Sequence, residues 1–276
     1  MTVGEAIRAA AARLQPASES ARLDAELLMA EVRGCNRARL LADGRDTLLP
    51  DQAAKFDALV SRRAGGEPVA YLRGRREFWG LDLAVNAAVL DPRPDTECLV
   101  EAALDCLGGR AEARILDLGT GSGAVALALA SECPDASVVA VDRSPAAAEV
   151  AHRNARRLGL ATVRVVVGDW LAPLSGQSWD LVVSNPPYVA PGDPHLSSLR
   201  HEPREALVAG DDGYACLQQI IDSACPRLAA GGWLWLEHGA GQGPGVRARL
   251  EAAGLERVHT RRDAGGRERA SGGCRA

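Results

Sequence analysis

One short segment of the chain combines an amide, two prolines and an aromatic ring directly after an apolar strand pattern. The run Asp180-Leu-Val-Val-Ser-Asn-Pro-Pro-Tyr188 ends in Asn185, Pro186, Pro187 and Tyr188. The prolines keep the backbone out of a helix, so the Pro186 carbonyl oxygen stays available as an acceptor. This carbonyl and the Asn185 side-chain oxygen can accept both hydrogens of one NH2 group, and Tyr188 can stack on its plane. The tetrapeptide therefore predicts a site that recognises a planar, conjugated amino group and positions its nitrogen.

A glycine-rich loop precedes this segment in the chain. The run Asp117-Leu-Gly-Thr-Gly-Ser-Gly123 follows an apolar strand pattern and opens a helix pattern at Ala124–Glu132. Glycines allow a sharp turn and let a ligand approach the backbone without a clash with Cβ atoms. Gly119, Gly121 and Ala124 also fit the dinucleotide pattern G-x-G-x-x-G/A. The loop predicts a nucleoside cofactor, but the loop alone does not distinguish NAD from S-adenosylmethionine.

Two further positions follow predicted strands and are expected at the same sheet edge. Asp142 ends the next strand, where a carboxylate can accept hydrogen bonds from ribose hydroxyls. The alternative for Asp142 is a helix N-terminal charge before Pro145. Asp169 and Trp170 follow the third strand, where they could border an adenine. The alternative for Trp170 is an ordinary core aromatic.

The elements that must position these residues alternate between strand and helix from about residue 96. Strands are predicted at Ala113–Leu118, Ser137–Val141, Val163–Val167, Leu181–Ser184 and Trp233–Leu236. Helices are predicted at Ala124–Glu132, Pro145–Leu158, Gly213–Leu228 and Gly245–Ala253. This alternation predicts an α/β fold with a mostly parallel sheet that is covered on both faces. Ligands of such sheets bind beyond the carboxyl ends of the strands, which is where the polar residues above are expected to meet.

The segment before this alternation is helical. Helices are predicted at Thr2–Gln15, with a capping-box spacing between Thr2 and Glu5, at Ser20–Val32 and at Pro50–Ala64. A strand of a small hairpin is predicted at Leu81–Val85, followed by the extended run Leu90–Pro94. We expect a helical domain over residues 1–66, a hairpin connector over 67–95 and an α/β domain over 96–276.

The C-terminal tail does not show a clear strand pattern. Residues Arg261–Ala276 are rich in arginine and glycine and lack the apolar alternation of a closing strand. Such a composition favours partial disorder. The sequence therefore leaves open whether the tail completes the final hairpin of the sheet.

Composition excludes several classes of protein. The 276 residues carry 32 Lys+Arg against 36 Asp+Glu, a formal net charge of -4, which argues against a broadly basic nucleic-acid-binding surface. The 7 cysteines are scattered and form no CxxC, which favours reduced thiols in the cytoplasm over disulfides or a zinc site. No apolar run reaches about 18 residues, and the N-terminus is unlike a signal peptide. We expect a cytoplasmic protein with no membrane span and no metal.

A family resemblance rests on several of these blocks. Asn185–Tyr188 together with Asp117–Gly123 resembles the S-adenosylmethionine-dependent methyltransferases that modify adenine, cytosine or glutamine nitrogen. Further blocks resemble the peptide chain release factor N5-glutamine methyltransferases and follow in order over nearly the whole chain. They are Ala21–Leu28, Gly66–Leu72, Glu77–Gly80, Pro92–Glu97, Glu202-Pro203 and Gly210-x-Asp-Gly213.

The resemblance implies a fold and a reaction. It implies a class I methyltransferase domain with a seven-stranded Rossmann-like sheet, an N-terminal helical domain that docks the substrate, and a hairpin connector. It implies methyl transfer from S-adenosylmethionine to the side-chain amide nitrogen of the glutamine in the Gly-Gly-Gln motif of release factors. No protein nucleophile is implied.

The resemblance also assigns residues. Implied cofactor contacts come from Gly119, Thr120, Gly121, Ser122, Gly123, Asp142, Trp170 and Asn185. The implied glutamine pocket consists of Asn185, Pro186, Pro187 and Tyr188, with Asn185, Pro186 and Tyr188 as the catalytic residues. Arg93, Thr96 and Glu97 are implied to border the site.

The sequence departs from the family at three places. Asp91 stands where an aliphatic residue usually precedes Pro-Arg-Pro, and this adds a charge near the site. The segment Gly239–Gln242 is small where the family often has a bulkier residue, and the tail lacks the closing strand pattern.

Competing functions remain at this point. Glutamine methylation of a ribosomal protein uses the same tetrapeptide, and only the N-terminal blocks favour release factors. A DNA or RNA adenine N6-methyltransferase would need a basic groove and base flipping, which the acidic balance disfavours. A degenerate binding module and an NAD dehydrogenase fit the intact tetrapeptide less well. We expect a monomer whose partner is a release factor, without direct nucleic-acid binding.

Overall fold

The computed structural model describes residues 1–210 and 212–276 and contains two compact units, Met1–Arg75 and Arg76–Ala276. Residue 211, inside the block Gly210–Gly213 noted above, lies outside the described residues. Among the helices of the described ranges, none is long and apolar enough to cross a membrane.

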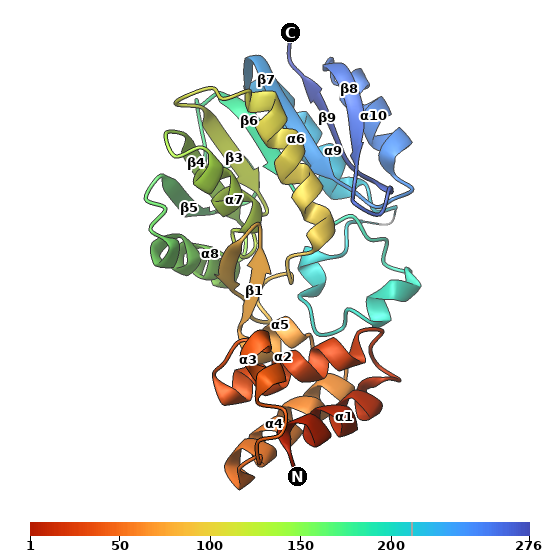
Figure 1. Ribbon diagram of the computed structural model, residues 1–276. Helices are drawn as coiled ribbons and strands as arrows, with labels where there is room; N and C mark the ends of the chain where they lie inside the picture. The colour runs from red at the N-terminus through yellow and green to blue at the C-terminus, as the bar shows by residue number, and fades with distance from the viewer. Residues whose placement is uncertain (211) are drawn as a thin grey trace. The chain divides into compact units, whose positions relative to one another are not determined.

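The N-terminal unit is built from five helices. They are α1 (Val3–Leu14), α2 (Ala21–Arg33), α3 (Arg37–Ala42), α4 (Pro50–Ala64) and α5 (Val69–Arg73) (Figure 1). The predicted capping box is present, since the Thr2 hydroxyl accepts from the Glu5 amide at 3.2 Å and Glu5 accepts from the Thr2 amide at 2.8 Å. The short helices α3 and α5 were not predicted. The Asn36 side chain caps α3, accepting from the Arg39 amide at 2.8 Å.

Apolar side chains from these helices form a core of their own. Leu14, Leu28, Met29 and Leu40 are almost completely buried in it. An ion pair between Arg63 of α4 and the buried Asp24 of α2, with an N–O distance of 2.7 Å, adds a polar link between these helices.

The C-terminal unit begins with a small hairpin of β1 (Arg75–Phe78) and β2 (Leu81–Ala84). Its turn contains Trp79, whose φ of 53° is a left-handed conformation. The buried Asn154 side chain accepts from the Ala84 amide at 2.7 Å and donates to the carbonyls of Ala84 and Ser122 at 3.0 and 2.9 Å. One side chain therefore ties the hairpin to the glycine-rich loop.

The main sheet has seven strands in the order β5-β4-β3-β6-β7-β9-β8. Their bounds are β3 (Arg114–Leu118), β4 (Ser137–Asp142), β5 (Val163–Val167), β6 (Trp179–Ser184), β7 (Leu228–Glu237), β8 (Glu256–Arg262) and β9 (Glu268–Cys274). Strands β3 to β7 pair in parallel, and β9 is antiparallel to both of its neighbours. The predicted α/β class with a seven-stranded, mostly parallel sheet is confirmed.

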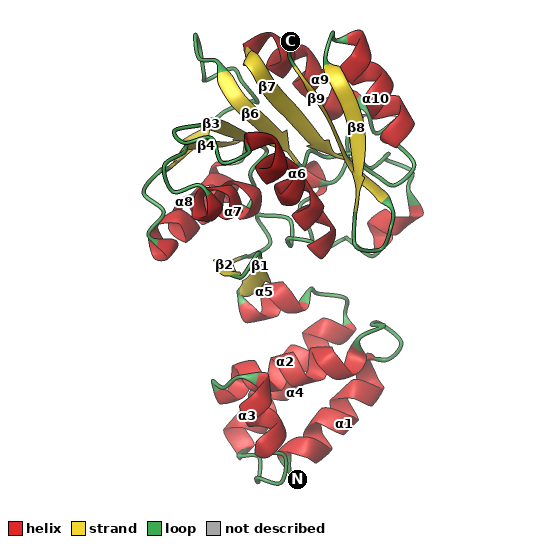
Figure 2. Ribbon diagram, turned by 45° about the horizontal axis from the view of Figure 1, so that its top comes forward, coloured by secondary structure: helices red, strands yellow, loops and turns green. Residues whose placement is uncertain are grey.

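Helices cover both faces of this sheet. They are α6 (Glu97–Leu107), α7 (Ala124–Glu132), α8 (Pro145–Leu158), α9 (Ala215–Ala224) and α10 (Gly243–Ala252). Side chains alternate along the strands, so Ile115 lies in the core with α6 and α7 while Leu116 lies in the core with α9 and α10. Figure 2 shows α6 on one side of the sheet and α9 on the other.

Two boundaries and one helix differ from the prediction. The helix expected at Gly213–Leu228 spans only Ala215–Ala224, and β7 already begins at Leu228, before the predicted start at Trp233. Helix α6 was not predicted as a separate element.

The expectation of a partly disordered tail is wrong, and the last hairpin, which the sequence left open, is complete. Strands β8 and β9 complete the sheet, and β9 lies between β7 and β8. Strand β9 lacks an apolar pattern because Trp235 of β7 fills the space over it. A Cβ atom at Gly272 would lie 2.3 Å from the Trp235 ring. Ala270 and Ser271 are fully buried beside it. Small residues in β9 thus serve packing rather than flexibility.

Candidate active site

The side chain of Asp117, the penultimate residue of β3, holds the glycine-rich loop through hydrogen bonds. Its Oδ2 accepts from the Thr120 hydroxyl at 2.7 Å and from the Ala126 amide at 3.2 Å. Burial raises the pKa of Asp117 to about 7, and these two hydrogen bonds oppose the rise. Gly119 and Gly121 have φ angles of 72° and 57°, in the left-handed region that glycine enters without strain.

Asp142, at the end of β4, joins this loop to the start of α8. Its Oδ2 accepts from the Gly121 amide at 2.9 Å, and its Oδ1 accepts from the Ser144 amide at 2.9 Å. Burial raises the pKa of Asp142, and the two amides and Arg143 oppose that rise. Because each carboxylate oxygen has a second lone pair, Asp142 can still accept from ligand hydroxyls.

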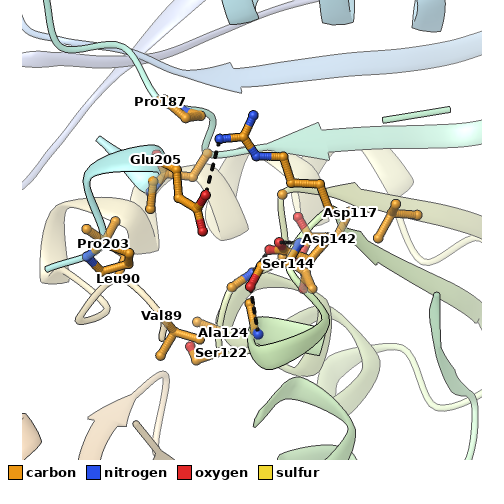
Figure 3. A pocket seen from close by; sticks show the side chains of 18 of the residues that line it. Val89, Leu90, Asp117, Ser122, Ala124, Asp142, Ser144, Pro187, Pro203 and Glu205 are labelled. Carbon is orange, nitrogen blue, oxygen red and sulfur yellow. Dashed lines mark hydrogen bonds and ion pairs between the residues drawn. The ribbon is translucent and has the colours of Figure 1, made fainter. Parts of the chain in front are cut away.

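A pocket of about 1090 Å³, open to solvent, lies over the carboxyl ends of these strands. Figure 3 shows Asp142 and Ser144 from the β4–α8 region and Glu205 from the segment after β6 around the same cavity. The predicted site residues that line it are Gly119, Thr120, Gly121, Ser122, Asp142, Asp169, Trp170, Asn185, Pro187 and Thr96. The topology therefore brings residues that are far apart in the sequence to one pocket. Thr96 and Pro187 are 91 positions apart.

Several predicted site residues do not line the pocket. Gly123 is one of these. A Cβ atom there would lie 2.9 Å from Leu127 Cδ1, so glycine leaves room for this side chain of α7. Pro186 and Tyr188 also lie outside the lining. Glu97 accepts from the Trp79 amide at 3.4 Å in the hairpin turn.

Other lining residues were not found by sequence reasoning. They include Val89, Leu90, Arg143, Ser144, Glu205 and Cys216. Arg143 and Ser144 directly follow Asp142, and Glu205 follows the block Glu202-Pro203, so proximity to a motif was the only available signal. Arg143 and Glu205 approach to 3.7 Å as an exposed ion pair.

The Asn185 side chain is oriented by a neighbour from the connector. Its Nδ2 donates to the Thr96 hydroxyl oxygen at 3.3 Å. Thr96 ends the 3₁₀ turn η1 (Pro94–Thr96) and is 3% exposed. With Nδ2 engaged, the oxygen Oδ1 of Asn185 remains the group that can accept from a ligand NH2.

The main chain after the tetrapeptide is held by Gln242. Its Nε2 donates to the Tyr188 carbonyl at 3.2 Å and to the Gly213 carbonyl at 3.3 Å, while its Oε1 accepts from the Gly239 amide at 2.8 Å. A Cβ atom at Gly239 would lie 3.1 Å from Gln242 Oε1. The small residues of this segment therefore allow Gln242 to reach Tyr188.

The extra charge at Asp91 is buried and compensated. Its carboxylate lies 3.6 Å from Arg76 and 3.7 Å from Arg93, and its amide donates to Glu202 Oε2 at 3.2 Å. Arg93 also pairs with Glu202. Burial raises the pKa of Asp91, and the two arginines oppose that rise. Arg93 does not line the pocket, whereas Leu90 and Pro92 on either side of Asp91 do.

Comparison with known families assigns the chain. Residues 5–74 match the family described as the PrmC N-terminal domain, and residues 95–202 match the methyltransferase small domain. The release factor glutamine methyltransferase of Escherichia coli K12 is 50% identical over 265 residues, 95% of each chain. The enzyme of the same name from Bordetella pertussis is 52% identical over 255 residues, 91% of this chain and 94% of that one. The chain belongs to the release factor glutamine methyltransferase family.

Solved structures agree with the methyltransferase fold. A methyltransferase from Pyrococcus furiosus has a TM-score of 0.56 at 18% identity, over 80% of this chain and 98% of that one. The 16S rRNA N2 G1207 methyltransferase of T. thermophilus, in complex with AdoMet and guanosine, has a TM-score of 0.54 at 21% identity, over 73% and 50% of the two chains. These structures share the fold of the seven-stranded sheet, and the curated relatives above confirm the family resemblance seen in the sequence.

Proposed function

We propose that this protein transfers a methyl group from S-adenosylmethionine to the side-chain amide nitrogen, N5, of the glutamine in the Gly-Gly-Gln motif of peptide chain release factors. The observation that carries the proposal is the orientation of Asn185. Its Nδ2 donates to Thr96 at 3.3 Å, so Oδ1 is available beside a pocket with a glycine-rich loop. Membership of the release factor glutamine methyltransferase family supports the same reaction.

The residues around the pocket fit the cofactor. Nothing lies within 4 Å of a Cβ atom built on Gly121, so the loop presents bare backbone to open space. We assign cofactor binding to the pocket-lining residues Gly119, Thr120, Gly121, Ser122, Asp142, Trp170 and Asn185, and to Gly123 only the turn of the loop. Asp142 would accept from ribose hydroxyls, and the Trp170 ring would contact the adenine. When bound, S-adenosylmethionine supplies a methyl group activated by the positive charge of its sulfonium.

The tetrapeptide then holds the glutamine amide. Asn185 Oδ1 and the Pro186 carbonyl accept the two N–H bonds, which fixes the nitrogen with one face toward the methyl group. The same two oxygens stabilise the positive charge that grows on the nitrogen during transfer. Pro187 and Tyr188 complete the pocket, and Tyr188 packs on the amide plane. The cationic N-protonated methylamide formed by the transfer is strongly acidic and loses one proton to water, which leaves the neutral methylamide, so no protein nucleophile and no metal are required.

Substrate choice is assigned to the helical unit. A single buried glutamine side chain offers little contact area, so a protein substrate needs a second surface for affinity. The match of residues 5–74 to the PrmC N-terminal domain supports a role of this unit in docking a release factor. The net charge of -4 favours a protein over a nucleic acid as substrate. We place the reaction in the cytoplasm and assign it to a monomer, and we expect free glutamine to be a poor substrate.

Radiolabelled methyl transfer to purified release factor tests this function. Label is expected on the native factor and not on a variant whose Gly-Gly-Gln glutamine is replaced by alanine. Label on a ribosomal protein or on DNA, with none on the release factor, would replace the proposed substrate. Equal turnover of free glutamine would contradict the docking role of the helical unit.

A further inference from the structure

A buried carboxylate lies behind the tetrapeptide and is not part of the pocket lining. Glu237 is the last residue of β7, next to the end of β6, and is 1% exposed. The Tyr188 hydroxyl donates to its Oε1 at 3.3 Å. Burying a carboxylate costs free energy unless donors satisfy it, so its neighbours are informative.

The second neighbour of Glu237 is Thr96. Hydrogen bonding from the Thr96 hydroxyl lowers the pKa of Glu237. The other oxygen, Oε2, is buried and has no hydrogen-bond partner within the described part of the chain, so a hydrogen from the Thr96 hydroxyl would satisfy it. Glu237 therefore neighbours Tyr188 of the proposed glutamine pocket and Thr96, the partner of Asn185.

Counting donors and acceptors gives this network a direction. An ionised carboxylate only accepts, so the Tyr188 hydroxyl donates to Oε1, and a Thr96 hydroxyl that satisfies Oε2 must also be the donor. The single hydrogen of Thr96 is then used, and its oxygen can only accept from Asn185. This explains why Nδ2 rather than Oδ1 of Asn185 faces Thr96, at 3.3 Å.

The charged surroundings of Glu237 come from several elements. Arg269 of β9 favours the ionised form, whereas Asp95 of η1 opposes it. Cys98 of α6 also faces this carboxyl, and burial raises the pKa of its thiol to about 12, so it stays neutral near pH 7. Burial raises the pKa of Glu237 itself to about 7. The carboxyl can thus change its protonation state in the neutral range.

We propose that Glu237 is a positioning residue for methyl transfer, which acts through Thr96 to fix the Asn185 amide with Oδ1 toward the substrate and through Tyr188 to hold the aromatic ring. The inference rests on the proposed function, since it concerns the same amide pocket. It adds a polar network behind the tetrapeptide that decides which end of the Asn185 amide meets the substrate.

The variant Glu237→Gln tests the direction of the network. Its side chain has nearly the same shape but carries two donor hydrogens, so Thr96 can accept from it and donate to Asn185 Oδ1. The Asn185 amide then turns and presents NH2 to the substrate NH2. We expect kcat to fall about 100-fold, comparable to the loss of one preorganised hydrogen bond in other active sites. The KM and the dissociation constant for S-adenosylmethionine should change less than about threefold.

Two further variants separate positioning from simple structural support. Thr96→Ser keeps the hydroxyl and should retain most of kcat, whereas the isosteric Thr96→Val should resemble Glu237→Gln. Combining Thr96→Val with Glu237→Gln should add little further loss, since residues of one network are not additive. Asp180→Asn is the matched control, because Asp180 pairs with Arg110 and Arg114 at the opposite end of β6 and should leave kcat unchanged.

The pH dependence of kcat distinguishes a positioning role of Glu237 from a purely structural one. The ionised form of Glu237 is the active one, so kcat of the native enzyme should rise as pH increases through about 7. Glu237→Gln should lose this rise. If the native enzyme is active and Glu237→Gln has the same kcat and the same pH profile, the role inferred for Glu237 is wrong while the proposed function stands. Absence of turnover by the native enzyme on release factor would instead overturn the proposed function.

Discussion

The chemistry assigned to this chain depends on single atoms of Asn185. An amide nitrogen is a poor nucleophile because its lone pair is delocalised, so a catalyst must orient it and stabilise the charge that develops there. Asn185 Oδ1 is suited to both tasks because the Thr96 hydroxyl engages Nδ2 at 3.3 Å. At this scale, the functional unit is a pair of acceptors with fixed spacing rather than a nucleophile or base.

Replacing Asn185 with alanine is the direct test of this assignment. Cofactor binding in the Asn185→Ala variant should largely survive, because the glycine-rich loop and Asp142 are intact. Methyl transfer to release factor should fall at least ~100-fold, since one acceptor of the substrate amide is lost. Calorimetric titration with the cofactor and single-turnover assays measure the two effects. Full turnover in this variant would exclude the role given to Asn185.

Among the elements, β9 shows how composition can hide a strand. Its residues are small because Trp235 of the neighbouring strand β7 occupies the volume above them. The antiparallel strand β9 also carries Arg269, which pairs with Asp263 and Asp95 at distances of 3.1 and 3.0 Å. The strand thus contributes both to the core and to the electrostatic surroundings of Glu237.

A larger side chain at Gly272 should destabilise this part of the sheet. The Cβ atom in Gly272→Val would lie 2.3 Å from the Trp235 ring, so either the ring or the strand must move. We expect the free energy of unfolding to drop by about 3 kcal/mol, the upper range for overpacked cores. Urea denaturation measures the change. The control Gly192→Val, at an exposed position with nothing within 4 Å, should stay within about 0.5 kcal/mol of the native protein.

At the scale of the whole molecule, the buried carboxyls of Asp117 and Glu237 link stability to pH. Burial raises the pKa of Asp117 and that of Glu237 each to about 7, from ordinary values of 3.8 and 4.5. The folded state therefore holds these protons to higher pH than the unfolded state does. The stabilisation is fully present below about pH 4 and is lost as pH rises toward 7.

This link can be isolated by substitution. From pH 5 to pH 8, the free energy of unfolding of the cofactor-free protein should fall more in the native protein than in Asp117→Asn or Glu237→Gln. The difference should be on the order of a few kcal/mol per site, since one pKa unit corresponds to about 1.4 kcal/mol. Urea titrations at the two pH values measure it. An identical pH dependence in all three proteins would show that these carboxyls ionise normally.

The sequence by itself determined the features that depend on neighbouring residues. Short apolar runs predicted the strands around Leu116 and Val139, the capping-box spacing of Thr2 and Glu5 predicted the start of α1, and the glycines predicted the loop after β3. The same local patterns carried the family resemblance. These predictions held because hydrogen bonding within a turn and a short apolar run bounded by turn residues are local properties.

The tertiary structure alone decided which distant residues meet. Thr96, Asn185 and Glu237 come together because β6 lies beside β7 and η1 (Pro94–Thr96) packs against Asn185, and no local pattern specifies that arrangement. Likewise, Gly272 belongs to a strand because Trp235 fills the space above it. The sequence could predict an amide and two prolines directly after a buried strand. Which end of that amide faces the substrate depends on a buried carboxylate 52 positions further along the chain from Asn185, which only the packing of the sheet brings near.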